Sequence, residues 1–288
     1  IAAIHPVMAF VVDIRRQAMV QHMMFKAMFE LSRDRADFLT LLFARPRPAG
    51  MDSTTGIQKM WEAYWVVGMD TALARTAAER VVNNLTRTHH FIFTQDEMGQ
   101  LRSVLEAFQT LGPAISTRGG GGGRGGGPGF NRGFSDMTGY SLDAAGVPQS
   151  FLSTEDNFRY VKSLEDRNLL VPVTGDFGGP KAIRAIGAWL KEQNGIVSAF
   201  YLSNVEQYLF QEQGKAQAFY DNVATLPTNS KSVFIRPYSM RGFGRGAYPN
   251  YPTNPADAVR SICPIENFLT AVKAGKVTSN NAALACGM

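Results

Sequence analysis

A strand, a turn, a helix and a second strand follow one another without a break in the second half of the chain. Residues 169–174 (LLVPVT) are apolar, residues 181–192 repeat apolar positions at helical spacing, and residues 196–202 are again mostly apolar. A strand–helix–strand unit of this spacing predicts parallel strands joined by a right-handed crossover. The pattern therefore indicates an α/β fold with a mostly parallel sheet.

The first half of the chain is predicted to be helical after one opening strand. Residues 7–14 are an apolar run that suits a strand buried on both faces. Residues 17–32 predict a Met-rich helix that is apolar nearly all round, which indicates a mostly buried helix. A further helix is expected over 95–111, opening on the capping box of Thr94 and Glu97, and a short strand is expected just before it, over 90–93.

Together these patterns predict one α/β domain over residues 1–288, with a three-layer, Rossmann-like architecture and a mostly parallel sheet. Residues 34–113 are interpreted as a helical insertion. Residues 118–134, in which ten of seventeen are glycine, are interpreted as a flexible Gly-rich loop. Because residue 1 is Ile, we expect that a start methionine precedes it.

The composition argues against a metal-binding protein and against a membrane-spanning protein. Cys263 and Cys286 lack metal-type spacing and are interpreted as free or incidental thiols, and the histidines show no ligand spacing that predicts a zinc or other metal site. The longest purely apolar stretch, 7–12, is far shorter than the roughly 20 residues that cross a bilayer, so we expect a soluble protein without a membrane span. Because a signal peptide could have preceded residue 1, the sequence does not predict the cellular compartment.

Three predicted strand ends carry candidate ligand-binding residues. Asp13 ends the first strand, Asp176 lies in the turn after 169–174, and Asn204 follows the next strand. The carboxyl ends of parallel strands line one crevice, where an acid can accept hydrogen bonds from ribose hydroxyls. The alternative for Asp13 is a surface acid paired with a nearby arginine.

The turn 175–180 (GDFGGP) has two interpretations. Its glycines let the backbone approach a ligand closely, and the following helix start offers free amides to an anion. Asp176 would then orient a substrate amine or act as a base. The alternative is an ordinary tight turn, with glycines for its dihedral angles and an acid that complements the helix N-terminus. The glycines concerned are Gly175, Gly178 and Gly179.

The segment after the third strand is also open to two interpretations. Asn204 and Glu206 are candidates for ligand contacts, whereas Ser203 with Glu206 matches a capping box, which is the favoured interpretation for Glu206. An alternative assignment of the strands makes 169–176 the first strand and makes Glu206 the acid that binds the ribose. Glu206 lies 27 residues beyond Gly179, more than the roughly 20 that such a site predicts.

Arginine, glycine and aromatic residues alternate over 118–134 and 241–251. Such segments bind RNA by charge and stacking, although a lid over an active site or a linker is the favoured interpretation here. The sequence contains no phosphate-binding loop of Walker type and no Gly-x-Ser-x-Gly elbow.

Four stretches of the chain resemble an uncharacterised family of bacterial proteins that is similar in fold to class I S-adenosylmethionine-dependent methyltransferases. They are 1–17 (IAAIHPVMAFVVDIRRQ), 29–50 (FELSRDRADFLTLLFARPRPAG), 151–158 and 168–210. The resemblance implies that Asp13 is the ribose-binding acid at the end of the second strand, and that a first strand with its glycine-rich loop precedes residue 1. It also implies that Asp176, after the fourth strand, is the substrate-orienting residue. Methyltransferases often carry Asn/Asp-Pro-Pro-Tyr at this point, where this chain has GDFGGP.

The resulting hypothesis is a methyltransferase-like protein with an unknown methyl acceptor. Asp176 is the candidate catalytic residue, and S-adenosylmethionine is the expected cofactor. The expected cofactor-binding residues are Asp13, Arg15, Gly175, Gly178, Gly179 and Asn204. The alternatives are a non-catalytic nucleotide-fold protein and an RNA-associated protein that uses its Arg/Gly-rich segments.

Overall fold

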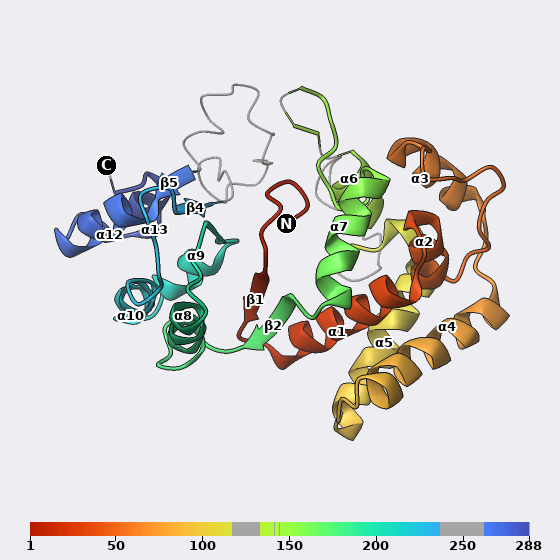
Figure 1. Cartoon of the computed structure of the whole chain (residues 1–288), viewed down its shortest axis with the longest axis horizontal. Helices are drawn as coiled ribbons and strands as arrows, with labels where there is room; N and C mark the ends of the chain where they lie inside the picture. Colours follow the sequence, from red (N-terminus) through yellow and green to blue (C-terminus); the bar gives the residue numbers. More distant parts are fainter. Residues whose placement is uncertain (117–132, 141, 144, 237–261, 288) are drawn as a thin grey trace. The chain divides into compact units, whose positions relative to one another are not determined.

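The computed structural model describes residues 1–116, 133–140, 142–143, 145–236 and 262–287 (Figure 1). Nearly all of the predicted Gly-rich loop and the whole Arg/Gly segment over 241–251 lie outside these residues. The chain divides into two compact units. The first unit comprises residues 1–11 and 15–172, and the second comprises 12–14 and 173–288.

The first unit is a helical assembly. Its long helix α1 packs against α5 and α7, and α2 packs against α1, α4 and α5. The described helices are α1 (Arg16–Leu31), α2 (Arg35–Phe43), α3 (Ile57–Val66), α4 (Thr71–Asn83), the π-helix η1 (Asn84–Thr88), α5 (Gln95–Leu111), the 3-10 helix η2 (Gly112–Ala114), α6 (Phe134–Gly139) and α7 (Glu155–Asp166).

The predictions for α1 and α5 are confirmed. Met24 and Met28 of α1 are fully buried, as expected of a helix that is apolar nearly all round. At the start of α5, Thr94 accepts a hydrogen bond from the Glu97 amide and the Glu97 carboxylate accepts one from the Thr94 amide, which is the predicted capping box. The short strand expected over 90–93 does not form, and these residues have no regular structure.

The core of the first unit is built on aromatic rings. Phe29 of α1, Phe38 of α2 and Phe158 of α7 form a triangle with ring centroids 4.8–5.6 Å apart. All three side chains are almost wholly removed from solvent. Burial of this apolar area, with one tilted, one stacked and one edge-on ring contact, stabilises the packing of the three helices.

Arg35 is a buried cation at the first position of α2, and its guanidinium joins three segments of the first unit. Its Nε donates to the Glu155 carboxylate at 3.2 Å, and its Nη1 donates to the carbonyls of Leu152 and Ser153. Its Nη2 donates to the carbonyls of Ser53 and Thr55. A buried charge is tolerated only when its hydrogen bonds are made, so the loop before α3 and the start of α7 must both be in place around α2.

A second polar cluster holds the π-helix η1 against α1. The Glu30 carboxylate accepts hydrogen bonds from Lys26 and from Asn84 of η1, and it pairs with the His89 ring at the end of η1. These hydrogen bonds hold the pKa of Glu30 below its usual value despite its partial burial. Lys26 also donates to the Glu165 carbonyl, which joins α1 to the end of α7.

The Glu165 side chain is buried beside this cluster, and burial raises its pKa to about 7. Glu165→Gln is therefore expected to stabilise the protein increasingly from about pH 4.5 to about pH 7, by up to about 3 kcal/mol. The native carboxyl keeps its proton to about pH 7, whereas the unfolded carboxyl loses it near 4.5, so the stability of the unsubstituted protein falls across that window.

Thermal unfolding of the Glu165→Gln variant and the unsubstituted protein between pH 4 and pH 9 measures this difference. Glu106→Gln, at an exposed position of α5, is the matched control and should give no pH-dependent gain. A difference for Glu165→Gln that stays constant from pH 4 to pH 9 would contradict the assignment.

The second unit combines a small sheet with short helices. Strand β4 (Val233–Ile235) pairs in parallel with β3 (Ala199–Tyr201) and antiparallel with β5 (Ile262–Pro264). The sheet buries Phe234 against Phe268 and, with the helices, encloses the core of the unit. The described helices of this unit are α8 (Ala182–Glu192), α9 (Val205–Leu209), α10 (Lys215–Val223), α12 (Ile265–Lys273) and α13 (Asn280–Leu284).

Strands β1 (Ala9–Asp13) and β2 (Leu170–Thr174) form a separate two-stranded sheet. The Ala9 amide donates to the Leu169 carbonyl at one end, and the Gly175 amide donates to the Asp13 carbonyl at the other. The strands therefore run parallel. The prediction of a strand within 7–14 is confirmed, but its five residues are only partly buried.

The prediction of a three-layer, Rossmann-like fold with one mostly parallel sheet is wrong. The described strands form a two-stranded and a three-stranded sheet, and β2 and β3, the two strands of the expected strand–helix–strand unit, belong to different sheets. The sheet strands β3, β4 and β5 are three residues long, and β5 is antiparallel. The helices over 34–113 bury their apolar faces largely in the helical core of the first unit.

The interpretation of both cysteines as free thiols is also wrong. Cys263 in β5 and Cys286 after α13 form a disulfide, with Cα atoms 5.8 Å apart. The chain between them folds back as α12 and α13, which brings together two residues 23 positions apart. A spacing of this length carries no local signal, so only the path of the chain reveals the pair.

Reduction of this disulfide is expected to lower the free energy of unfolding by about 3 kcal/mol, because the unfolded chain then gains the freedom of an open loop. Urea unfolding with and without a reductant measures the loss. The paired substitution Cys263→Ala with Cys286→Ala is the control and should not respond to the reductant. An unchanged midpoint after complete reduction would contradict the stabilising role.

Candidate functional site

The end of β1 and the turn after β2 adjoin within the second unit. The Gly175 amide donates to the Asp13 carbonyl at 2.9 Å, which extends the strand pairing into the turn. The Asp13 side chain is partly buried at this strand end. The structure thus brings together the predicted ribose acid and the predicted cofactor turn, which lie in opposite halves of the sequence.

Asp176 is the anchor of the turn 175–180. Its carboxylate accepts a hydrogen bond from the Lys215 ammonium at 2.5 Å and another from the Gly178 amide at 2.9 Å. The Lys215 hydrogen bond is the main cause that holds the pKa of Asp176 below its usual value. A carboxylate with a lowered pKa is a weak base near neutral pH, so this geometry favours a structural role for Asp176.

Close packing accounts for glycine at two positions of the turn. A Cβ at Gly175 would overlap the Ala182 side chain at the start of α8, and a Cβ at Gly178 would lie 3.1 Å from Lys215 of α10. Neither residue has a positive φ. The space beside these glycines is therefore filled by neighbouring residues of the second unit, which favours the interpretation as a tight turn at these two positions.

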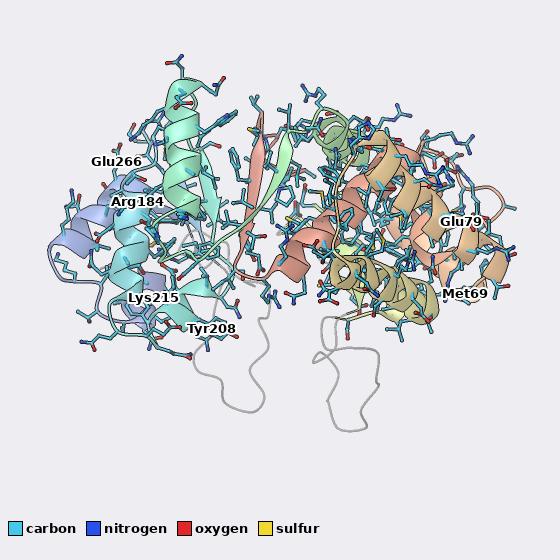
Figure 2. All side chains as sticks on the ribbon, turned by 90° about the horizontal axis from the view of Figure 1, so that it is seen from below. Met69, Glu79, Arg184, Tyr208, Lys215 and Glu266 are labelled. Carbon is cyan, nitrogen blue, oxygen red and sulfur yellow. A yellow bond between two sulfur atoms is a disulfide. The ribbon has the colours of Figure 1, made fainter. Side chains whose placement is uncertain are left out.

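Asn222 of α10 fixes the far side of the turn, and the sequence analysis missed it. Its Nδ2 donates to the carbonyls of Phe177 and Gly179, and its Oδ1 accepts from Arg184 Nε at 2.6 Å. Arg184 projects from α8, and Lys215 begins α10 (Figure 2). An asparagine inside a helix carries no local signal of this role, because its partners lie more than thirty-five positions away.

Asn204 lies at the N-cap position of α9 and is exposed. Its backbone amide donates to Ser203 Oγ, and its Oδ1 accepts from the same hydroxyl. The capping box expected from Ser203 and Glu206 does not form. The Glu206 side chain is buried in the core instead. This burial also argues against Glu206 as the ribose-binding acid of the alternative strand assignment.

Glu206 is the acceptor of a buried network. Arg236 Nε and Nη2 donate to its two carboxylate oxygens at 2.7 and 2.9 Å, and the Tyr220 hydroxyl donates at 2.9 Å. The guanidinium also lies over the rings of Phe234 and Phe268, within 4.6 Å of each centroid. This bidentate pair with aromatic stacking joins α9, α10, β4 and α12.

Arg15 lies at the N-cap position of α1 and is exposed, in the first unit. Its neighbour Arg16 pairs with Glu97 of α5. Among the predicted site residues, the structure gathers Asp13 and the turn, whereas Arg15 and Asn204 lie on other segments. The assignment of all of them to a cofactor stays a prediction.

Glu206→Gln is expected to lower the free energy of unfolding by about 3 kcal/mol or more, because it leaves the buried Arg236 charge without its carboxylate. Tyr220→Phe removes one hydrogen bond to a charged acceptor and should cost less, about 2 kcal/mol. Urea unfolding of each variant measures both losses. Glu212→Gln, at an exposed position before α10, is the control, and a loss for Glu206→Gln no larger than for the control would contradict the network.

The chain belongs to the family described as Domain of unknown function (DUF7790), whose model matches residues 137–285, more than half of the chain. The match covers α7, β2 and the described elements of the second unit from α8 to α13. No curated protein matches the chain. Family membership therefore supports no particular activity.

Within the described residues, no group of three or more His, Cys, Asp or Glu side chains is placed to hold a metal ion. Over the same part of the chain, no helix combines the length and the apolar character that crossing a bilayer requires.

Proposed function

We propose that the second unit binds S-adenosylmethionine beside the adjoining ends of β1 and β2, and that the protein transfers its methyl group to an acceptor. The observation that carries the proposal is the 2.9 Å hydrogen bond from the Gly175 amide to the Asp13 carbonyl. It holds an acid at a strand end next to a glycine-containing turn. An acid so placed is suited to accept hydrogen bonds from the two ribose hydroxyls of a nucleoside.

The role proposed for the turn is positioning. Asp176, Lys215 and Asn222 hold the backbone of 175–179 by hydrogen bonds from two sides. Methyl transfer depends chiefly on the in-line alignment of donor and acceptor, so a rigid turn contributes without a proton-transferring side chain. The ion pair of Asp176 with Lys215 fits this role better than that of a general base.

A non-catalytic binding protein is the second candidate, and the same ion pair favours it. With its carboxylate occupied by Lys215 and the Gly178 amide, Asp176 has reduced capacity to orient a substrate amine. Ligand binding without methyl transfer to any acceptor would select this candidate over the first.

Calorimetric titration of the whole protein with S-adenosylmethionine and S-adenosylhomocysteine tests the binding site. We expect dissociation constants in the micromolar range and loss of binding in Asp13→Ala, because the ribose loses its acceptor. Asp221→Ala, an exposed acid of α10 in the same unit, is the control and should bind normally. Absence of binding to the folded protein, or equal binding by Asp13→Ala, would overturn the proposal.

A further inference from the structure

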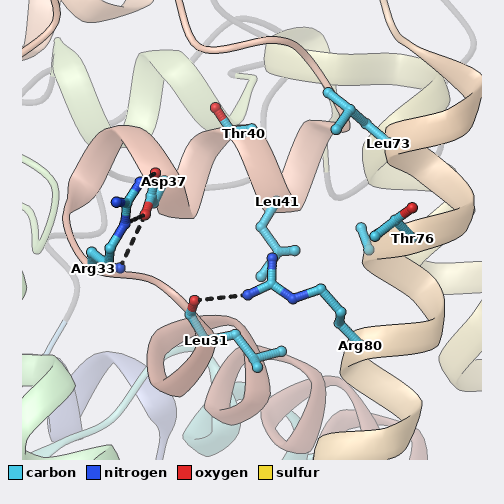
Figure 3. A pocket seen from close by; sticks show the side chains of 9 residues that line it. Leu31, Arg33, Asp37, Thr40, Leu41, Leu73, Thr76 and Arg80 are labelled. Atoms are coloured by element: carbon cyan, nitrogen blue, oxygen red, sulfur yellow. Dashed lines mark hydrogen bonds and ion pairs between the residues drawn. The ribbon is translucent and has the colours of Figure 1, made fainter.

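A trough in the first unit lies between one face of α2 and one face of α4, and it has a volume of about 430 Å³ (Figure 3). This volume is within the range of small-molecule sites. Helix α4 presents positions spaced three and four residues apart, and the chain between α1 and α2 closes one end. The lining residues are Leu31, Arg33, Asp37, Thr40, Leu41, Leu73, Thr76, Ala77 and Arg80.

The trough has an apolar wall. Leu41 of α2 and Ala77 of α4 are buried, and Leu73 is partly buried on the same face of α4. All three side chains line the trough, where the hydrocarbon part of a ligand would contact them. Removal of that hydrocarbon from water would supply most of the binding free energy.

The charges in the trough leave one cation without a carboxylate partner. Arg33 donates to both oxygens of Asp37. Arg47 pairs with Asp37 and with Asp34, so these two cations and two carboxylates compensate one another. Arg80 instead donates from Nη2 to the Leu31 carbonyl at 3.2 Å, and no carboxylate among the described residues pairs with it (Figure 3). Its guanidinium therefore keeps its charge uncompensated and further N–H donors available.

The two threonine hydroxyls that line the trough differ in what they offer an anionic ligand. Tyr64 donates its hydroxyl hydrogen to the Ala36 carbonyl, so the hydrogen bond between Thr40 and Tyr64 uses the hydrogen of Thr40. Thr40 then presents only lone pairs, which repel an anion. Thr76 has no such commitment among the described residues and lies on α4 near Arg80, where its hydroxyl can donate.

We propose that this trough binds a medium-chain carboxylate, with its chain along Leu41, Leu73 and Ala77 and its head group on Arg80. A monoanion matches the single uncompensated cation, whereas a phosphate dianion would require a second one. The trough lies wholly in the first unit, so it shares no residue with the nucleoside site proposed for the second unit.

Titration of the whole protein with sodium octanoate, followed by ligand-observed NMR and calorimetry, tests the proposal. We expect saturable binding with one site per chain and binding weakened by about tenfold in Arg80→Gln, because a charge-assisted hydrogen bond is lost. Arg75→Gln removes an exposed arginine from the same helix but outside the trough, and it should bind as the unsubstituted protein does.

Two further measurements separate the site from non-specific uptake. Thr76→Phe, at an exposed lining position of α4, narrows the trough without a change of charge and should abolish binding, while circular dichroism checks that the variant is folded. Octan-1-ol, which lacks the carboxylate, should bind at least about tenfold more weakly than octanoate. Octanoate binding that is unaffected by both Arg80→Gln and Thr76→Phe, or octanol binding of equal strength, would overturn the proposal.

Discussion

The first unit depends on the burial of Arg35. Its guanidinium is 2% exposed and donates to one carboxylate and four carbonyls drawn from two loops and the start of α7. Removal of a charge from water costs several kcal/mol unless such partners are present, so α2, the loop before α3 and the start of α7 must be ordered together. The aromatic contacts of Phe38 with Phe29 and Phe158 then join α2 to α1 and to α7.

The second unit also contains a buried arginine that pairs with a buried glutamate, but here aromatic rings surround the pair. Arg236 and Glu206 are both buried, and the Tyr220 hydroxyl and the rings of Phe234 and Phe268 complete the environment of the pair. The disulfide between Cys263 and Cys286 adds a covalent link to the same sheet, whose three strands are short. In a small unit with few core residues, the disulfide offsets the limited apolar area.

The turn at 175–180 illustrates how a ligand-binding pattern and a structural turn share one sequence. Glycine before the start of a helix suits close approach by a phosphate or a nucleoside, but here Ala182 and Lys215 approach Gly175 and Gly178. Asp176 similarly has a protein cation as its partner. The nucleoside site is proposed around Asp13, which lies at the end of the other strand of the pair.

The sequence by itself determined the elements whose signals are local. The buried helix α1, the capping box of α5, the strands β1 and β2 and the amphipathic helix α8 each follow from spacing within a few residues. Only the tertiary structure decided the pairing of those strands, the disulfide, the partners of Arg35 and the inward turn of Glu206. Short apolar runs do not encode which sheet they join, and a charged side chain does not encode a partner a hundred residues away, because both depend on how the helices pack.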